Sequence, residues 1–312
     1  MKVPYQRTLM SNRPFRDKMH RLIGSTAKGL YLNLQNYPDQ AFVTINDVTY
    51  KIYPKKSGIH QELYLYKLRE PFTTEIVKRI IQKNQCVIDV GSNIGYYALL
   101  ESKLVGKNGL VFAVEPVLEN MKLLRENIRI NNAANIRPYQ LAFGSENKID
   151  TIFISKTCNW CTLNKTKSSD LEIVGTQPVT VTTVDDFVQA NSCKPSFIRM
   201  DVEGYEHEIL KGMSKTMKYI ETLLIEVHPP LMDDVNGFID ILKSNNYRAR
   251  YVIYENKVLP NKIVDLFTKY ERITDIIYKN VPLNKLKEIL PLKNGMPNIL
   301  FIKHGAEKRL GL

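Results

Sequence analysis

From residue 87 onward, short apolar runs alternate with amphipathic stretches, and this alternation limits the possible folds more than any other feature of the chain. The amphipathic stretches have helical periodicity, because their apolar residues recur at steps of three and four. Strands that alternate with helices form a parallel sheet with helices on both faces, so an α/β fold is predicted. The predicted strands are 87–91, 110–115, 136–143, 197–202 and 222–227, and the predicted helices are 94–105, 118–130, 206–213 and 238–245.

Other elements flank this alternation. Alternating apolar and polar residues around Asn46-Asp47 predict a β-hairpin over 41–54. Helical spacing after Thr73-Thr74 predicts a helix over 74–81 that leads into the first strand. Further strands are expected at 150–155 and 179–184, where they would roof the site, and at 299–302.

These elements predict one main domain with small additions at both ends. The expected parts are a basic N-terminal arm over 1–40, a β-hairpin cap over 41–72, the α/β domain over 73–304 and a basic tail over 305–312. The segment 255–296 lies within the domain but has no pattern that assigns it a role.

The charge of the chain favours an anionic partner. The formal net charge is +12, and the first 28 residues contain seven basic residues and one acidic residue, Asp17. Such an arm is either a solvated terminus or a contact to a polyanion or a membrane surface. No apolar run approaches the ~18 residues that a membrane span needs, and no signal-peptide pattern is present, so a cytoplasmic location is expected.

The cysteines indicate a reducing compartment. Four cysteines are too few and too scattered for a disulfide framework in a chain of 312 residues. Cys158 and Cys161 have C-x-x-C spacing, but no second pair follows to complete a four-ligand zinc site. This stretch is therefore expected to be a plain loop.

The stretch "CVIDVGSNIGYYALL", from Cys86 to Leu100, predicts a buried strand, a glycine loop and a helix. Gly91 and Gly95 allow a close backbone approach to a ligand, and Asn93 tolerates a left-handed conformation. A loop of this kind binds either a dinucleotide or an adenosyl amino acid, and alone it does not distinguish between them.

Two acidic residues favour the adenosyl amino acid. Glu115 ends the next strand, where a carboxylate can accept hydrogen bonds from both ribose hydroxyls, as in NAD and S-adenosylmethionine sites. Asp89 lies at the edge of the glycine loop, where it would repel a pyrophosphate by ~1 to 4 kcal/mol but attract the ammonium group of a methionine moiety. We therefore expect S-adenosylmethionine, with Asp89 in contact with its ammonium group.

These motifs resemble those of the FkbM family of S-adenosylmethionine-dependent O-methyltransferases. The resemblance rests on "DVGSNIG", "DVEGYE", "EVHP" and the closing "NILFIK", and it covers about two thirds of the chain. It implies a class I methyltransferase fold, which is a Rossmann-like, mostly parallel sheet of seven strands whose last strand is antiparallel. Arg199 stands where the family commonly has lysine.

The resemblance also implies which residues bind the cofactor. The cofactor loop falls on Asp89, Gly91, Ser92, Asn93 and Gly95. The ribose carboxylate falls on Glu115, and the backbone near Ala142 would border the adenine.

Four polar residues are candidates for the chemistry on the acceptor side. Asp201 and Glu203 follow one strand, and Glu226 and His228 end the next, so these groups should lie across the mouth from the methyl donor. His228 or Asp201 is expected to act as the general base. Alternatively, Asp201, Glu226 and His228 could bind a divalent cation such as magnesium or manganese.

The sequence thus predicts methyl transfer from S-adenosylmethionine to a hydroxyl of a glycan, glycolipid or small metabolite. An RNA methyltransferase is an alternative because of the basic arm, although no RNA-binding signature is present. A non-catalytic binding protein on the same fold is a further alternative, and so is a nicotinamide oxidoreductase.

Overall fold

The computed structural model describes residues 36–156, 161–164, 172–255, 276–290 and 296–306. The basic arm up to residue 35, Cys158, Trp160, most of the segment 255–296 and the tail from residue 307 lie outside the described residues.

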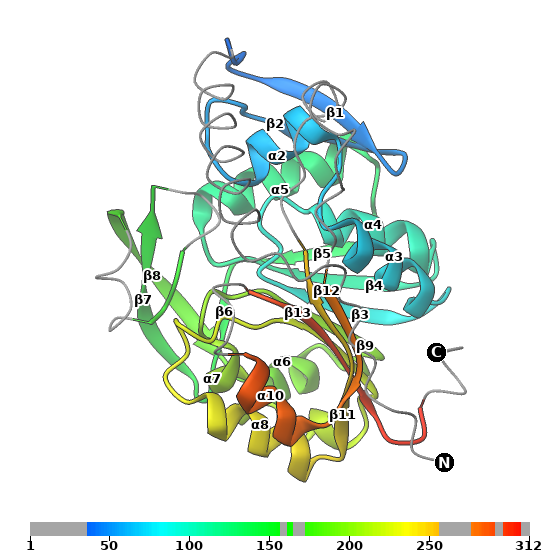
Figure 1. Cartoon of the computed structure of the whole chain (residues 1–312). Helices are drawn as coiled ribbons and strands as arrows, with labels where there is room; N and C mark the ends of the chain where they lie inside the picture. The colour runs from blue at the N-terminus through cyan, green and yellow to red at the C-terminus, as the bar shows by residue number, and fades with distance from the viewer. Residues whose placement is uncertain (1–35, 157–160, 165–171, 256–275, 291–295, 307–312) are drawn as a thin grey trace, which may run out of the picture.

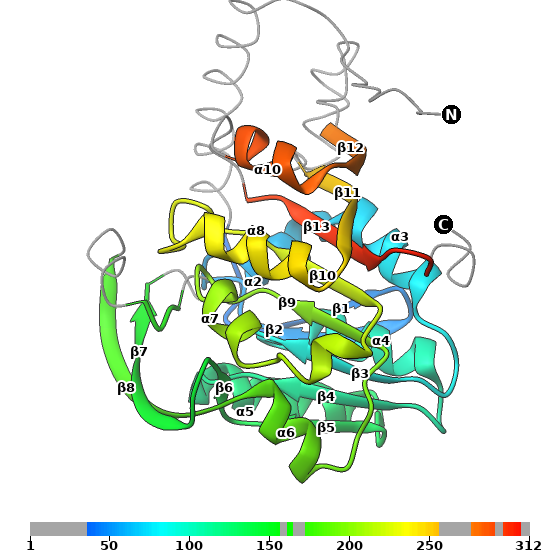
Figure 2. The same cartoon turned by 90° about the horizontal axis from the view of Figure 1, so that it is seen from below.

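A large mixed sheet forms the centre of the molecule (Figures 1 and 2). Its strand order is β12-β11-β13-β10-β9-β3-β4-β5. β5, β4, β3, β9 and β10 are parallel, and β13 pairs antiparallel with both β10 and β11. The strands are β3 (Cys86–Val90), β4 (Leu110–Val114), β5 (Ile136–Tyr139), β9 (Phe197–Met200), β10 (Thr222–Glu226), β11 (Tyr247–Tyr254), β12 (Ile276–Val281) and β13 (Asn298–Lys303).

The Rossmann-like α/β fold expected from the sequence is confirmed, including the antiparallel closing strand. The seven strands from β11 to β5 match the number that the resemblance implied, although no strand was predicted at the position of β11. An eighth strand, β12, pairs antiparallel with β11 at the edge, and it comes from the segment to which the sequence assigned no role.

Helices cover both faces of the sheet, as Figure 2 shows. Each face has its own hydrophobic core, with residues such as Phe187 and Phe238 on one side and Leu99 and Leu124 on the other. One face is covered by α3 (Pro71–Ile80), α4 (Tyr96–Val105) and α5 (Leu118–Ile130), and the other by α6 (Val184–Ala190), α7 (Glu206–Lys211), α8 (Val235–Ser244) and α10 (Leu283–Ile289). A short 3-10 helix, η2 (Thr216–Lys218), precedes β10. The predicted helix at 74–81 begins earlier, because Pro71 occupies its first turn.

A second, three-stranded sheet stands beside the large one, with the order β6-β8-β7. Its strands are β6 (Ala142–Phe143), β7 (Lys148–Ser155) and β8 (Ile173–Thr182). The prediction of one strand over 136–143 is therefore wrong, because the chain leaves the large sheet after Tyr139 and joins the small sheet at Ala142.

The N-terminal hairpin packs against α5. It consists of β1 (Ala41–Ile45) and β2 (Val48–Ile52), and α2 (Ile59–Tyr66) follows it. The fully buried Asn127 on α5 accepts a hydrogen bond from the backbone N–H of Lys51 at 2.8 Å and donates one to the carbonyl of Ile94 at 2.9 Å. One side chain thereby connects the hairpin to the glycine loop.

No helix in the described part of the chain is both long enough and apolar enough to span a bilayer.

We expect Asn127→Ala to lower the free energy of unfolding by about 1–3 kcal/mol, because it leaves buried backbone groups without partners. Denaturant unfolding measures this change. The control is Asn131→Ala, which removes hydrogen bonds of 2.9 and 2.7 Å to the backbone of Thr49 at a half-buried position where water can replace them. Equal losses in the two variants would contradict the role of Asn127.

Candidate functional site

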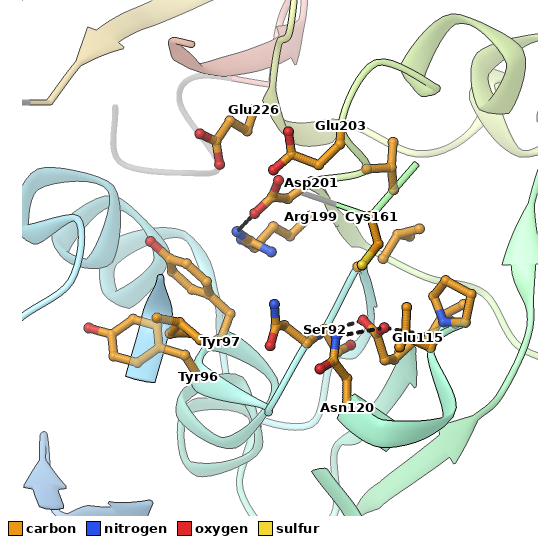
Figure 3. Close-up of a pocket in the computed structure, with 18 of the residues that line it drawn as sticks. Ser92, Tyr96, Tyr97, Glu115, Asn120, Cys161, Arg199, Asp201, Glu203 and Glu226 are labelled. Atoms are coloured by element: carbon orange, nitrogen blue, oxygen red, sulfur yellow. Dashed lines mark hydrogen bonds and ion pairs between the residues drawn. The ribbon is translucent and has the colours of Figure 1, made fainter. Parts of the chain in front are cut away.

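A cavity of about 230 Å³ opens at the carboxyl ends of β3, β4, β9 and β10. Ligands of open α/β sheets bind at this edge. Figure 3 shows its two halves, with Ser92, Glu115 and Asn120 on one side and Asp201, Glu203 and Glu226 on the other. All four acceptor-side candidates come from this edge, although not all of them reach the cavity.

The glycine loop between β3 and α4 has the backbone conformation expected from its residues. Gly91, Asn93 and Gly95 have φ values of +77°, +50° and +95°. A Cβ atom on Gly91 would lie 1.9 Å from the carbonyl oxygen of Asp201. Only glycine permits this approach between the loop and the end of β9, so the two halves of the site depend on it.

Glu115 lies directly after β4 and lines the cavity beside this loop. Its carboxylate accepts hydrogen bonds from the backbone N–H of Asn93 at 2.8 Å and of Val117 at 3.0 Å, and from the Asn120 side chain at 3.2 Å. Burial raises the pKa of Glu115 to about 7 although these hydrogen bonds lower it. The carboxylate oxygens keep lone pairs for further donors, such as ribose hydroxyls.

The small sheet and the segment 161–164, which lies between β7 and β8, close one side of the cavity. Ala142 lines the cavity, as do Cys161 and Leu163. Thr162 donates a hydrogen bond from its hydroxyl to the backbone carbonyl of Glu203 at 2.9 Å. The segment between β7 and β8 is thus hydrogen-bonded to the turn at Glu203.

Asp89 does not contact the cavity, contrary to the expectation that it meets the ammonium group of a cofactor. Its side chain is fully buried, and it is not among the described residues that line the cavity. Its carboxylate accepts a hydrogen bond from Arg199 at 3.2 Å. The acid beside the glycine loop therefore neutralises a buried arginine on the neighbouring strand β9.

On the acceptor side, Asp201, Glu203 and Glu226 line the cavity. Asp201 accepts a hydrogen bond from Arg199 at 3.0 Å. Burial raises the pKa of Glu226 well above its ordinary value, and the neighbouring carboxylates of Asp201 and Glu70 raise it further. Glu226 therefore resists ionisation, whereas Arg199 keeps Asp201 in an ion pair.

His228 lies behind the cavity wall. Its side chain is fully buried, its Nδ1 atom is 2.6 Å from Glu206, and its Nε2 atom is 3.1 Å from Glu203. Burial by itself would lower the pKa of His228, but these two carboxylates outweigh burial and hold that pKa well above its ordinary value. The prediction that His228 takes a proton directly from the acceptor does not fit this placement.

Several residues of the cavity were not singled out from the sequence. Arg69 and Glu70 line it from the segment between α2 and α3, and Tyr97 lines it from α4. Arg69 is paired with Glu70 at 2.9 Å, and Tyr97 donates a hydrogen bond to Glu70 at 2.7 Å. Glu206 was also missed, although it belongs to the "DVEGYE" motif, because only the fold brings it to His228.

The cavity is acidic although the chain as a whole is basic. Arg69 and Arg199 are the arginines that line it among the described residues, and both are paired with carboxylates. The acidic residues that line it in the same part of the chain are Glu62, Glu70, Glu115, Asp201, Glu203, Glu226 and Glu255.

Comparison with known families and proteins gives two family matches. The model described as Methyltransferase FkbM domain matches residues 89–249, and the model described as Protein-L-isoaspartate(D-aspartate) O-methyltransferase matches residues 30–144. Among curated proteins, the chain is 28% identical over 148 residues to the hexuronic acid methyltransferase AglP of Haloferax volcanii. That match covers 47% of this chain and 57% of the relative, so it spans little more than half of the relative's length.

Two solved structures are reported among those similar to this chain. The methyltransferase FkbM of Methylobacillus flagellatus KT has a TM-score of 0.40 and 19% identity, over 62% of this chain and 43% of that one. The TYW2 protein of M. jannaschii in complex with AdoMet has a TM-score of 0.41 and 16% identity, over 86% of this chain and 89% of that one.

We expect Gly91→Ala to lower the free energy of unfolding by clearly more than Gly106→Ala does. Both glycines have positive φ, +77° and +70°, but a Cβ atom on Gly106 would meet nothing within 4 Å. Gly106→Ala thus measures backbone strain alone, of order 1–3 kcal/mol. Denaturant unfolding of the two variants gives the comparison, and equal losses would show that the approach to Asp201 is not required.

Proposed function

The chain belongs to the FkbM family of S-adenosylmethionine-dependent methyltransferases, and on this premise we propose that the acceptor of its methyl group is a hydroxyl oxygen of a glycan, glycolipid or small metabolite. The observation that carries this proposal is the acidic acceptor half of the cavity. The oxygens of carboxyl and carboxylate groups accept hydrogen bonds from hydroxyl groups.

For the cofactor, we assign the glycine loop to the amino-acid end and Glu115 to the ribose. The positive φ values of Gly91, Asn93 and Gly95 support close contact between the loop backbone and a ligand. The position of Glu115 beside Asn93 supports its contact with the ribose hydroxyls. Ala142, which lines the cavity near this end, is assigned to the adenine.

In the proposed reaction, the acceptor oxygen attacks the methyl carbon of the sulfonium in line. The new O–C bond forms as the C–S bond breaks, and the bonding electron pair goes to sulfur. The hydroxyl proton leaves to Asp201 and then to water. The cavity holds the two reactants in line, and such alignment can supply about 7–11 kcal/mol of the barrier reduction.

A glycan acceptor is supported by the relative from Haloferax volcanii, which is named as a hexuronic acid methyltransferase. A neutral sugar fits the cavity better than a free hexuronate, because both arginines are already paired with carboxylates. The acceptor is therefore assigned as a sugar or metabolite whose reacting part is uncharged.

The net charge of +12 is the one observation that favours RNA as an acceptor. However, RNA would bring phosphates to a cavity whose arginines in the described part of the chain, Arg69 and Arg199, are both already paired with carboxylates. Because neither of these arginines is available to pair with a phosphate, RNA is the weaker proposal.

Methyl transfer from labelled S-adenosylmethionine to fractionated cell extract tests the proposed acceptor class. We expect label in the polysaccharide, glycolipid or small-metabolite fraction, in a linkage that survives mild base as an ether does. Incorporation into RNA alone would contradict the assignment, as would a base-labile ester.

We expect the affinity for S-adenosylhomocysteine to weaken as the pH falls from 8 to 6. The pKa of Glu115 is raised to about 7, so its carboxylate gains a proton over this range and loses acceptor capacity for the ribose hydroxyls. Coupling to one proton limits the change to about tenfold per pH unit. Glu115→Gln should bind at least tenfold more weakly at pH 8 and show a flat profile, as measured by calorimetry.

The control for this experiment is Glu119→Gln, which makes the same charge change four residues later, at an exposed position that is not among the described residues lining the cavity. It should keep the wild-type profile. Repeating the titration with 5′-methylthioadenosine, which has the ribose but no titratable amino-acid tail, should preserve the pH dependence if Glu115 causes it. A profile that is unchanged in Glu115→Gln would remove Glu115 from the ribose site.

A further inference from the structure

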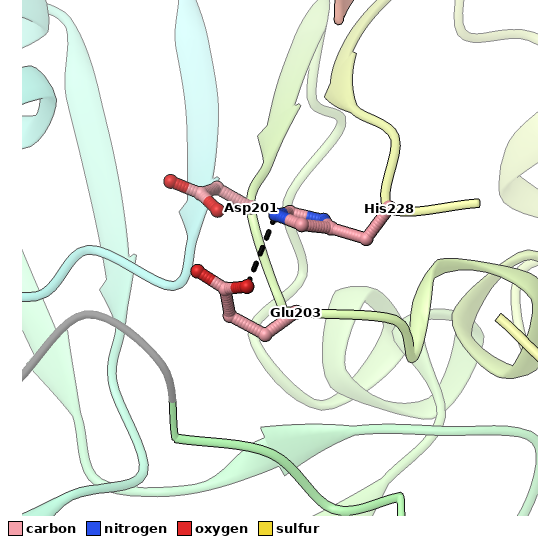
Figure 4. A group of neighbouring side chains, drawn as sticks. All are labelled: Asp201, Glu203 and His228. Atoms are coloured by element: carbon pink, nitrogen blue, oxygen red, sulfur yellow. Dashed lines mark ion pairs between the residues drawn. The ribbon is translucent and has the colours of Figure 1, made fainter. Parts of the chain in front are cut away.

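Three side chains that follow β9 and β10 converge on one another (Figure 4). Asp201, Glu203 and His228 each offer one ligand atom, and these atoms all lie within 4.8 Å of one another. Their side chains are 15%, 9% and 0% exposed, respectively. Such a set of two carboxylates and one imidazole is suitable for a divalent cation.

A second observation concerns the two facing atoms of this set. The Nε2 atom of His228 and the Oε2 atom of Glu203 are 3.1 Å apart, yet neither makes a hydrogen bond of proper geometry. Ligands at about 2.0–2.2 Å from an ion in adjacent octahedral positions lie about 2.8–3.1 Å apart. The spacing therefore suits two neighbouring ligands of one ion.

The surroundings of His228 orient its ring for this task. The Nδ1 atom contacts Glu206 at 2.6 Å, and the same carboxylate oxygen accepts the backbone N–H of Gly204 at 3.1 Å. A carboxylate on the far nitrogen is the usual way in which a protein fixes a metal-binding imidazole and directs its other nitrogen at the ion. Glu206 therefore acts as a positioning residue.

The backbone of Glu203 is held in a strained conformation beside this ring. Its φ value is +54°, which is uncommon for a residue with a side chain, and Gly204 follows with φ of +97°. Strain of about 1–3 kcal/mol persists where the surroundings enforce it, often at functional sites. Here the hydrogen bond from Thr162 to the backbone carbonyl of Glu203 secures the turn.

We propose that Asp201, Glu203 and His228 form a binding site for one divalent cation of the manganese or magnesium class. Glu203 thus takes the place of Glu226 in the cation set considered from the sequence. The carboxyl groups of Asp201, Glu203 and Glu206 meet at one imidazole ring, and oxygen and imidazole ligands of this kind suit a divalent ion.

The site opens toward the acceptor, because Asp201 and Glu203 also line the cavity. An ion there has coordination positions left for an acceptor hydroxyl, whose pKa it would lower. This catalytic role rests on the proposed function, whereas the binding of the ion does not.

Direct titration with manganese tests the site. The full chain is dialysed against EDTA and then against metal-free buffer, and Mn²⁺ binding is followed by electron paramagnetic resonance and by calorimetry. We expect one Mn²⁺ per chain in the wild type. Glu203→Gln and His228→Gln should each weaken binding at least tenfold, because each removes one ligand.

The matched control is Glu62→Gln, which makes the same change at a carboxylate that lines the same cavity but is paired with Arg69. It should keep the wild-type Mn²⁺ affinity. Circular dichroism and S-adenosylhomocysteine binding show which variants are folded, and the two ligand variants provide independent tests. Absence of one-to-one binding in the wild type overturns the proposal, and so does equal binding by folded Glu203→Gln and His228→Gln. Neither result affects the transfer reaction, which is tested separately with labelled donor.

Discussion

The guanidinium group of Arg199 is the interaction on which the arrangement of the site depends. It is 3% exposed and joins Asp89 on β3, at 3.2 Å, to Asp201 after β9, at 3.0 Å, while the ring of Tyr97 covers it at 4.0 Å. A guanidinium stays charged and donates hydrogen bonds in several fixed directions, so this one residue fixes the positions of both carboxylates. Because an unpaired buried charge costs about 3–5 kcal/mol, these positions constrain one another. The cofactor loop and the acceptor-side acid are therefore placed together.

Much of the fold could be predicted because periodicity is a local property of the sequence. Apart from β5, the strands and helices of the central alternation begin and end within three residues of the predicted positions, and α5 has the predicted bounds. Pairing between strands is not local, which is why the division of 136–143 between two sheets was missed. Nothing in the residues from 142 to 143 reveals that their partner is β8, about forty residues later. β12 escaped prediction for the same reason, because it depends on an antiparallel partner, β11.

The sequence predicted where in the fold the candidate site lies, but it did not predict which residues of the site contact one another. Parallel strands end at one edge, so Asp201, Glu203 and Glu226 could be brought together from their positions in the sequence. The directions of side chains depend on neighbours that the sequence does not identify. Asp89 and His228 lie at the predicted strand ends but turn toward Arg199 and toward Glu203 and Glu206. The argument from Asp89 reached the correct donor class, although the Asp89 side chain is turned toward Arg199 and is not among the described residues that line the cavity.

The placement of carboxylates on the acceptor side has a consequence for the rate of transfer. S-adenosylmethionine carries its positive charge on sulfur, and during transfer this charge moves to the acceptor oxygen until the hydroxyl proton leaves. Acids close to sulfur would stabilise the bound donor, whereas acids close to the acceptor stabilise charge that develops only in the transition state. Asp201 and Glu203 follow β9, across the cavity from Glu115 on the cofactor side. The net charge of +12 acts at long range on encounter, whereas in the proposed reaction the acceptor oxygen would meet carboxyl groups at contact.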